Sequence, residues 1–157
     1  MRILGIDPGL QITGYGVLDF SRAQPQLVDG GVIRLSAKSS LADRLVELQI
    51  ELENLLDESK PDICAVEQLY AHYKHPRTAV LMAHARGVIL VVAQRRKVNV
   101  REFPANRIKQ AVVSHGHASK LQMQRAVQQQ LKLKFLPEPP DVADALAVAL
   151  CCGHNLR

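Results

Sequence analysis

Four carboxylates are placed so that their type and spacing could support chemistry. Asp7 ends an apolar run just before a Pro-Gly turn, and Glu67 ends a second apolar run. Asp141 and Asp144 lie three residues apart in the sequence PPDVADALAVAL, so they would project from one face of a helix. Because carboxylates packed together repel, such a cluster needs a cation, and oxygen-only ligation suits Mg²⁺ or Mn²⁺. Two such ions about 4 Å apart can support phosphodiester hydrolysis.

Each acid also has a structural explanation. Asp7 could be a turn residue, or part of a phosphate loop, since the sequence GIDPG also occurs in actin-like ATPases. An acid in the first turn of a helix complements the helix dipole, and for Asp141 alone we favour that explanation. Asp144 lies one turn further in, beside an apolar face, which favours a functional role. The decision depends on whether the four acids converge.

The elements that would position these acids follow from the periodicity of the apolar residues. Helical spacing of leucines predicts a helix from Leu41 to near Ser59, with Ser39 or Ser40 as N-cap. We expect strands over residues 2–6, 13–20, 26–35, 63–66 and 98–103, and further helices over residues 77–94, 105–113, 120–131 and 140–152.

This order predicts an α/β fold in one domain spanning residues 1–157. Short connections favour an antiparallel arrangement of the first three strands, and the helix after the third implies a parallel crossover to the fourth. The result is a five-stranded mixed sheet with helices on both faces. Open sheets place ligands at the carboxyl ends of their strands, where Asp7 and Glu67 would meet if their strands are neighbours.

Charge is unevenly distributed along the chain of 157 residues, whose formal net charge is +5. Residues 1–94 carry nine Lys/Arg against eleven Asp/Glu, whereas residues 95–157 carry eleven against four. A basic half is typical of a protein that binds a polyanion, although a solvated basic surface would give the same balance.

Composition excludes several other classes of protein. The three cysteines have no C-x-x-C spacing, so neither a zinc site nor a disulfide framework is indicated, and a reducing compartment fits. We expect no signal peptide and no transmembrane segment, because the apolar runs are far shorter than the roughly 20 residues that span a bilayer. The expected location is therefore the cytoplasm, with no membrane partner.

The motifs ILGIDPG, TGYGV, AVEQLY, ARGV and DVADALAVA resemble, in order and spacing, those of the RuvC family of bacterial Holliday-junction resolvases. The resemblance implies a ribonuclease H-like homodimer that nicks two opposed strands of a four-way DNA junction symmetrically, in recombination and repair. It implies a divalent metal, two ions per site, and the RuvA–RuvB branch-migration complex as partner. Helix 77–94 would then be the dimer helix, although burial against the sheet explains its apolar residues equally well.

Carried over by position, the resemblance makes Asp7, Glu67, Asp141 and Asp144 the catalytic, metal-binding carboxylates. Its expected DNA contacts are an aromatic ring that stacks on bases near the crossover and three basic residues, namely Tyr70, Lys74, Lys109 and Lys120.

The chain departs from the family pattern at several histidines. His75 follows Lys74 at the position where the family has an amide side chain, and Pro76 stiffens the same loop. These changes leave the preferred cleavage sequence open. His84 is interpreted as a packing or interface residue, and His115 and His117 flank Gly116 in a loop that faces the basic region. The chain also ends soon after Cys152, without the basic tail of many relatives.

Three rival functions remain open. The actin-like class normally needs two domains and a second phosphate loop, for which this length leaves no room. A related family of small ribonuclease H-like nucleases acts on ribosomal RNA, and the pair Asp141 and Asp144 together with Tyr70 argues against it. The third rival is a junction-binding protein without catalysis, against which the presence of all four acids argues.

Overall fold

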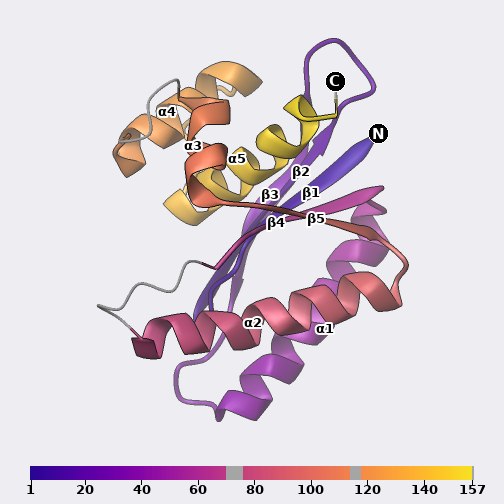
Figure 1. Cartoon of the computed structure of the whole chain (residues 1–157), viewed down its shortest axis with the longest axis vertical. Helices are drawn as coiled ribbons and strands as arrows, with labels where there is room; N and C mark the ends of the chain where they lie inside the picture. The colour runs from indigo at the N-terminus through magenta and orange to yellow at the C-terminus, as the bar shows by residue number, and fades with distance from the viewer. Residues whose placement is uncertain (70–75, 114–117, 157) are drawn as a thin grey trace.

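The computed structural model describes residues 1–69, 76–113 and 118–156, with the backbone alone at Pro76. In these ranges, five strands and five helices follow one another in the predicted order (Figure 1). The strands are β1 Arg2–Asp7, β2 Ile12–Asp19, β3 Gln26–Arg34, β4 Ile63–Glu67 and β5 Asn99–Phe103. The helices are α1 Leu41–Ser59, α2 Pro76–Arg95, α3 Ala105–Val112, α4 Lys120–Leu131 and α5 Pro140–His154.

The strands form one mixed sheet in the order β3-β2-β1-β4-β5. β2 pairs antiparallel with both β1 and β3, whereas β1, β4 and β5 are mutually parallel. The predicted five-stranded mixed sheet is therefore confirmed, and β1 and β4 are neighbours. Central position explains why the four inner residues of β1 are all buried, since both faces of a central strand are covered.

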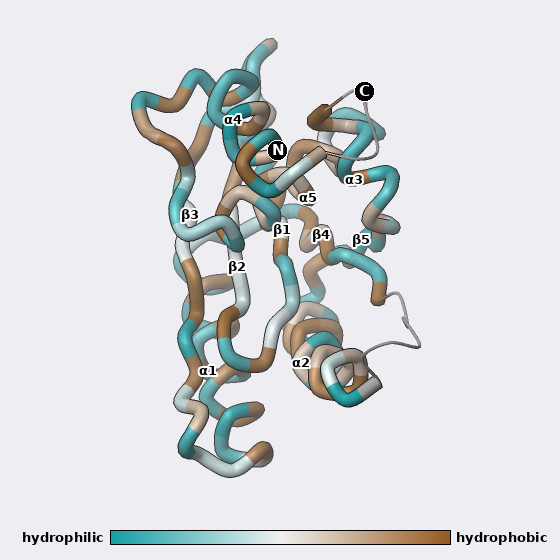
Figure 2. Tube along the Cα trace, turned by 90° about the vertical axis from the view of Figure 1, so that its left-hand side faces the viewer, coloured by the Kyte–Doolittle hydropathy of each residue, from teal (hydrophilic) through white to brown (hydrophobic). Residues whose placement is uncertain are grey.

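Helices cover both faces of the sheet, as Figures 1 and 2 show. One core combines α5, α3 and α4 with side chains such as Ile3, Leu18 and Ala65. The other combines α1 and α2 with side chains such as Leu4, Ile6 and Val66. Because successive strand residues point to opposite faces, this division assigns every residue of β1 and β4 to one of the two layers.

Local signals explain where the helices begin and end. Ser40 caps α1 by accepting a hydrogen bond from the Asp43 amide at 3.1 Å, which selects between the two predicted serines. Ser119 and Gln122 form a reciprocal capping box at the start of α4. The last helix, α5, continues two residues past the predicted end at Cys152, because Gly153 lets the helix pass against the Phe20 ring.

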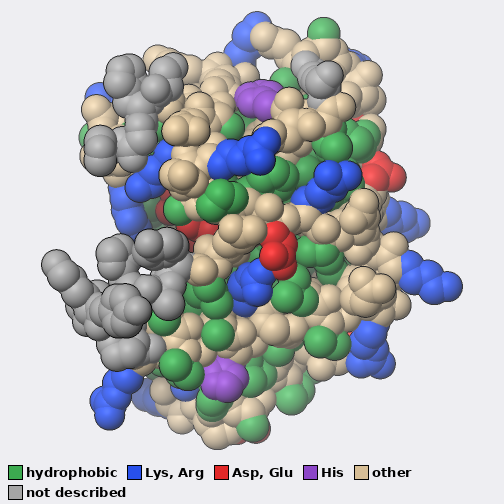
Figure 3. Space-filling model, in the orientation of Figure 1, with side chains coloured by type: hydrophobic (Ala, Val, Ile, Leu, Met, Phe, Trp, Pro, Cys, Tyr) green, Lys and Arg blue, Asp and Glu red, His purple; other side chains and the backbone are tan. Residues whose placement is uncertain are grey.

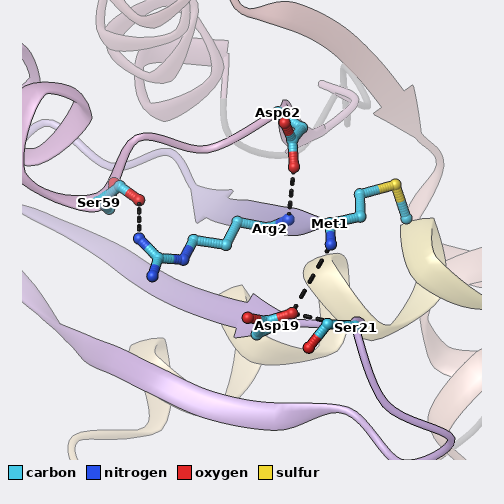
Figure 4. Close-up of polar contacts among 6 residues, drawn as sticks. All are labelled: Met1, Arg2, Asp19, Ser21, Ser59 and Asp62. Carbon is cyan, nitrogen blue, oxygen red and sulfur yellow. Dashed lines mark hydrogen bonds and ion pairs between the residues drawn. The ribbon is translucent and has the colours of Figure 1, made fainter.

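Hydrogen bonds and an ion pair hold the N-terminus at the end of the sheet where β1 begins (Figure 4). The Arg2 guanidinium donates to the Ser59 carbonyl at 2.9 Å, and the Arg2 amide donates to the Asp62 carboxylate at 2.7 Å. The terminal ammonium lies 3.7 Å from the Asp19 carboxylate, which also accepts from the Ser21 amide. These contacts tie β1 to the end of α1 and to the start of β4.

α2 has two different faces. Ala85, Ile89 and Val92 are buried in the core with α1. The stripe Val80, His84, Gly87 and Val91, spaced four, three and four residues apart, is exposed instead. Burial against the sheet therefore accounts for only one side of this helix.

No helix in the described part of the chain is both long enough and apolar enough to cross a membrane.

Candidate active site

Asp7 and Glu67 are the last residues of the neighbouring parallel strands β1 and β4. The register pairs Ile6 with Val66, so the next residues along the two strands are side by side, about 5 Å apart. Ile6 and Val66 both point into the core with α1 and α2. By alternation, Asp7 and Glu67 point to the opposite face, which α5 covers.

Glycines allow the first turns of α5 to lie directly on the sheet. Gly14 is opposite Asp7 in the β1–β2 register, and a Cβ atom there would lie 2.7 Å from the carbonyl carbon of Asp141. A Cβ atom on Gly5 would lie 2.7 Å from the amide nitrogen of Ala149. Only residues without a side chain permit this approach, which sets the start of α5 beside Asp7.

The electrostatics of the site indicate that the four predicted carboxylates lie near one another. The pKa of Asp7 is raised to about 8, chiefly by burial and then by the charges of Glu67, Asp144 and Asp141. Burial and the charge of Asp144 raise the pKa of Glu67. Burial also raises the pKa of Asp144, with a smaller contribution from Asp141. Mutual repulsion across three elements is the expected signature of a carboxylate cluster.

Two predicted DNA contacts, Lys109 and Lys120, border the same cluster. The charge of Lys120 opposes the rise in the pKa of Asp7 and of Asp144. The charge of Lys109 opposes the rise in the pKa of Glu67 and of Asp144. Both lysines line a pocket of about 220 Å³ together with Glu67, Asp144 and Met123. In Figure 3, acidic side chains lie between basic ones beside the grey segments at the left of the molecule. The other two predicted contacts, Tyr70 and Lys74, lie outside the described residues, as do His75, His115 and His117.

The donor set fits a hard divalent cation. Within the described ranges, the four carboxylates accept no hydrogen bond and form no ion pair closer than 4 Å, so their oxygens are available as ligands. Among the described residues, the groups that converge here are carboxylates, whose oxygens suit Mg²⁺ or Mn²⁺ rather than zinc. No three His, Cys, Asp or Glu side chains in residues 1–69, 76–113 and 118–156 form a closed ligand cluster. Ion binding would therefore require these side chains to draw together.

Sequence reasoning missed two features that position the site. The glycine-rich sequence of β2 does not identify α5 as the element that packs against Gly14 and Gly16. Sequence reasoning also missed the ion pair between Arg86 of α2 and Glu102 of β5. Glu102 pairs with Val66 in the sheet register. The ion pair therefore links α2 to β5 at a position beside the end of β4. An Arg on a largely apolar helix was the available signal.

His84 is exposed, so it is not a core packing residue within the described chain. The interface interpretation of His84 depends on whether a second copy covers the exposed face of α2. The basic residues of the C-terminal half have a clearer position, since α3 and α4 carry Lys109 and Lys120 to the carboxylates. The predicted charge asymmetry therefore includes two cations at the site.

A carboxylate cluster at the carboxyl ends of β1 and β4, on a mixed sheet of this topology, defines a nuclease of the ribonuclease H-like class. Residues 3–152 match the family model of crossover junction endodeoxyribonuclease RuvC. The chain is 46% identical to the RuvC of Rhodopirellula baltica, covering 98% of this chain and 86% of that one. It is 44% identical to the RuvC of Petrotoga mobilis, covering 100% and 96%.

A solved structure gives the same result for the fold. The structure of Thermus thermophilus RuvC in complex with a Holliday-junction substrate superposes with a TM-score of 0.92 at 32% identity, covering 100% of this chain and 95% of that one. The predicted ribonuclease H-like fold is therefore confirmed. The chain belongs to the RuvC family of crossover junction endodeoxyribonucleases, which are metal-dependent nucleases. This membership excludes the actin-like ATPase and the ribosomal RNA nuclease as readings of the same motifs.

Proposed function

We propose that residues 1–157 act as a single nuclease domain that resolves four-way DNA junctions by symmetric paired nicks. The observation that carries this proposal is the convergence of Asp7, Glu67, Asp141 and Asp144 with Lys109 and Lys120. Carboxylates and lysines in one pocket suit a phosphodiester substrate, because the lysines attract phosphate and the carboxylates hold the cations that hydrolysis requires.

Each group has a distinct role in this proposal. Asp7 is the most central of the carboxylates, since all three others raise its pKa. Asp7, Glu67, Asp141 and Asp144 would hold two Mg²⁺ ions, for which Mn²⁺ could substitute. Ions bound there supply activation of the attacking water and stabilisation of the leaving oxygen. Lys109 and Lys120 orient the phosphate backbone over the carboxylates, and Tyr70 and Lys74 contact the DNA near the crossover.

Symmetric nicking requires two active sites, and we propose a homodimer through α2. The stripe Val80, His84, Gly87 and Val91 is exposed in the isolated chain. Val80 and Val91 are each 56% exposed, and apart from the neighbouring backbone of α2 itself no described atom lies within 4 Å of a Cβ built on Gly87. An apolar stripe with a glycine at its centre suits close packing of a second copy. The dimer would act in the cytoplasm with the RuvA–RuvB complex during recombination and repair.

Cleavage of a synthetic mobile four-way junction with Mg²⁺ or Mn²⁺ tests the proposal, beside a linear duplex and an RNA–DNA hybrid. We expect paired nicks at symmetric positions in the junction alone. Equal cutting of the linear duplex would contradict structure selectivity. Absence of cutting with both metals, together with tight junction binding, would favour the binding protein without catalysis.

The substitution Asp7→Asn tests the site within the same assay. Loss of one central carboxylate should abolish cutting while junction binding persists, because binding depends on the lysines. Asp19→Asn is the matched control, since Asp19 also ends a strand but carries a different set of contacts at the N-terminus. Wild-type cutting by the Asp7→Asn variant would show that the carboxylate assignment is wrong.

A further inference from the structure

Phe135 is an aromatic side chain that the proposed function does not use. It lies in the segment 132–139, which joins α4 to α5. The ring is 82% exposed, whereas the next most exposed large apolar side chain in the described ranges, Val46, is 57% exposed. Phe103, in comparison, is 7% exposed. Scattered exposed apolar residues are ordinary, but a ring this far out of the protein has almost no intramolecular contact.

The backbone around Phe135 is fixed on both sides. The Leu133 amide donates to the Gln128 carbonyl at 2.9 Å, and the Gln128 side chain donates back to the Leu133 carbonyl at 3.4 Å. The buried side chain of Gln124 donates to the Pro137 carbonyl at 3.0 Å. Two anchors thus enclose Phe135, so its exposure follows from an ordered segment that presents the ring to solvent.

The same anchors place Phe135 relative to the candidate active site. Lys120, Gln124 and Gln128 are four residues apart on α4 and therefore share one face. Since Leu133 is fastened at Gln128 and Pro137 at Gln124, the segment runs back along α4 toward Lys120. At 1.5 Å per helical residue, the level midway between the anchors is about 9 Å along α4 from Lys120. Phe135 therefore lies on a segment that runs back along α4 toward the pocket that Lys120 lines.

Charge around the ring favours a polyanion. Lys132 and Lys134 precede Phe135 in the sequence and are both exposed, as is Arg125 on the neighbouring α4. Glu138 is the one acidic residue of the segment. An aromatic ring among cations is the arrangement with which proteins bind strands whose bases can be reached, because the ring stacks on any base and the cations contact phosphates.

We propose that Phe135 is a DNA contact, on which a base near the crossover stacks while Lys132 and Lys134 hold the adjacent phosphates. The inference rests on the proposed function, since it assumes that junction DNA crosses the pocket at Lys120. It adds an aromatic contact on the α4 side of the site, distinct from Tyr70, which follows Glu67 in the sequence.

Junction binding by variants of Phe135 tests this contact. All proteins in the binding assay carry Asp7→Asn, so that the labelled junction is not cut. Stacking predicts that Phe135→Ala weakens binding by at least about fivefold and that Phe135→Tyr binds within about twofold of the parent. Phe135→Leu keeps an apolar side chain but no ring, so it should bind nearly as weakly as the alanine variant. Val46→Ala, an exposed apolar truncation on α1, is the matched control and should bind as the parent does.

A base analogue provides a direct measurement. With 2-aminopurine placed in turn at the nucleotides around the crossover, one position should be quenched in the parent complex and not in the Phe135→Ala complex. Parent-like binding by Phe135→Ala, or by Phe135→Leu, would overturn the stacking proposal. A change in sedimenting mass of the free Phe135→Ala protein would also overturn it, in favour of a protein contact. If the unsubstituted chain cuts junctions and Phe135→Ala binds normally, only this inference fails, whereas failure of the unsubstituted chain to cut concerns the proposed function itself.

Discussion

Asp7 is the most perturbed carboxylate of the candidate active site, and its chemistry depends on its neighbours. Its position at the end of β1 is compatible with a turn, a phosphate loop or a metal ligand. The raised pKa, about 8, arises because burial and three other carboxylates disfavour its charge. That environment is the reason why we propose Asp7 as a metal ligand rather than as a turn residue.

The stability of the metal-free protein should therefore depend on Asp7 and on pH. The pKa of Asp7 rises from 3.8 to about 8 on folding, so the folded state binds the proton more tightly. Stability is highest below pH 4 for this group and is lost as pH rises through about 8. Asp7→Asn removes the charge, so its thermal midpoint in EDTA should exceed that of the wild type increasingly between pH 4 and pH 8.

Added Mg²⁺ provides the complementary measurement. A cation that binds the folded carboxylates stabilises the wild type by mass action, and Asp7→Asn should gain much less. Equal midpoints for the two proteins at pH 8 in EDTA would contradict the electrostatic account of Asp7.

Lys109 and Lys120 should contribute to the affinity for DNA. Replacing either lysine by Gln removes one phosphate contact, so junction binding should weaken and the dependence of log K on log salt should fall by about 0.9. Fluorescence anisotropy at several salt concentrations measures both quantities. Lys38→Gln, in the exposed connection between β3 and α1, is the matched control. An unchanged salt dependence for both Lys109→Gln and Lys120→Gln would place the DNA elsewhere.

At the scale of the element, the position of α5 on β1 and β2 determines whether the carboxylates meet. Gly14→Ala should push the start of α5 from the sheet, because the new Cβ would lie 2.7 Å from the Asp141 carbonyl carbon. We expect loss of cutting and a destabilisation of about 1–3 kcal/mol from overpacking, measured by denaturant unfolding.

Gly30→Ala is the matched control for this substitution. Gly30 lies on the adjacent strand β3, and its nearest contact would be an ordinary 3.4 Å from Val142 Cγ1. Wild-type cutting by Gly14→Ala would show that α5 can shift without separating Asp141 from Asp7.

Most elements could be predicted from the sequence because each is specified by local signals. Alternation and leucine spacing predicted the strands and α1, whereas the capping box of Ser119 and Gln122 at the start of α4 was found only in the structure. What local signals do not encode is contact between distant elements. The glycines of β2 indicated crowding, but only the three-dimensional arrangement shows that α5 causes it. For the same reason, Arg86 on the largely apolar α2 signals a polar contact but does not identify Glu102 as its partner.

At the scale of the whole molecule, one side of α2 packs in the core and the other side is available for assembly. Its inner face is required for the core, whereas the stripe Val80, His84, Gly87 and Val91 contacts no described part of the chain closely enough to be buried. The adjacent groove between α2 and β5 is also largely apolar and is lined by Leu90, Val91 and Val100. An exposed apolar surface of this kind is typical of a protein interface.

Val91→Asp should therefore separate the proposed homodimer into monomers with an intact fold. A carboxylate is compatible with the exposed face of a single chain, but burying it without a partner at a dimer interface is costly. Sedimentation should show the monomer mass for Val91→Asp and the dimer mass for Val46→Asp, a control with a similarly exposed valine on α1. Because paired nicks need two active sites on one junction, Val91→Asp should also convert paired cutting into slow single nicks. Wild-type mass and paired nicks in this variant would exclude α2 as the dimer helix while leaving the carboxylate site unaffected.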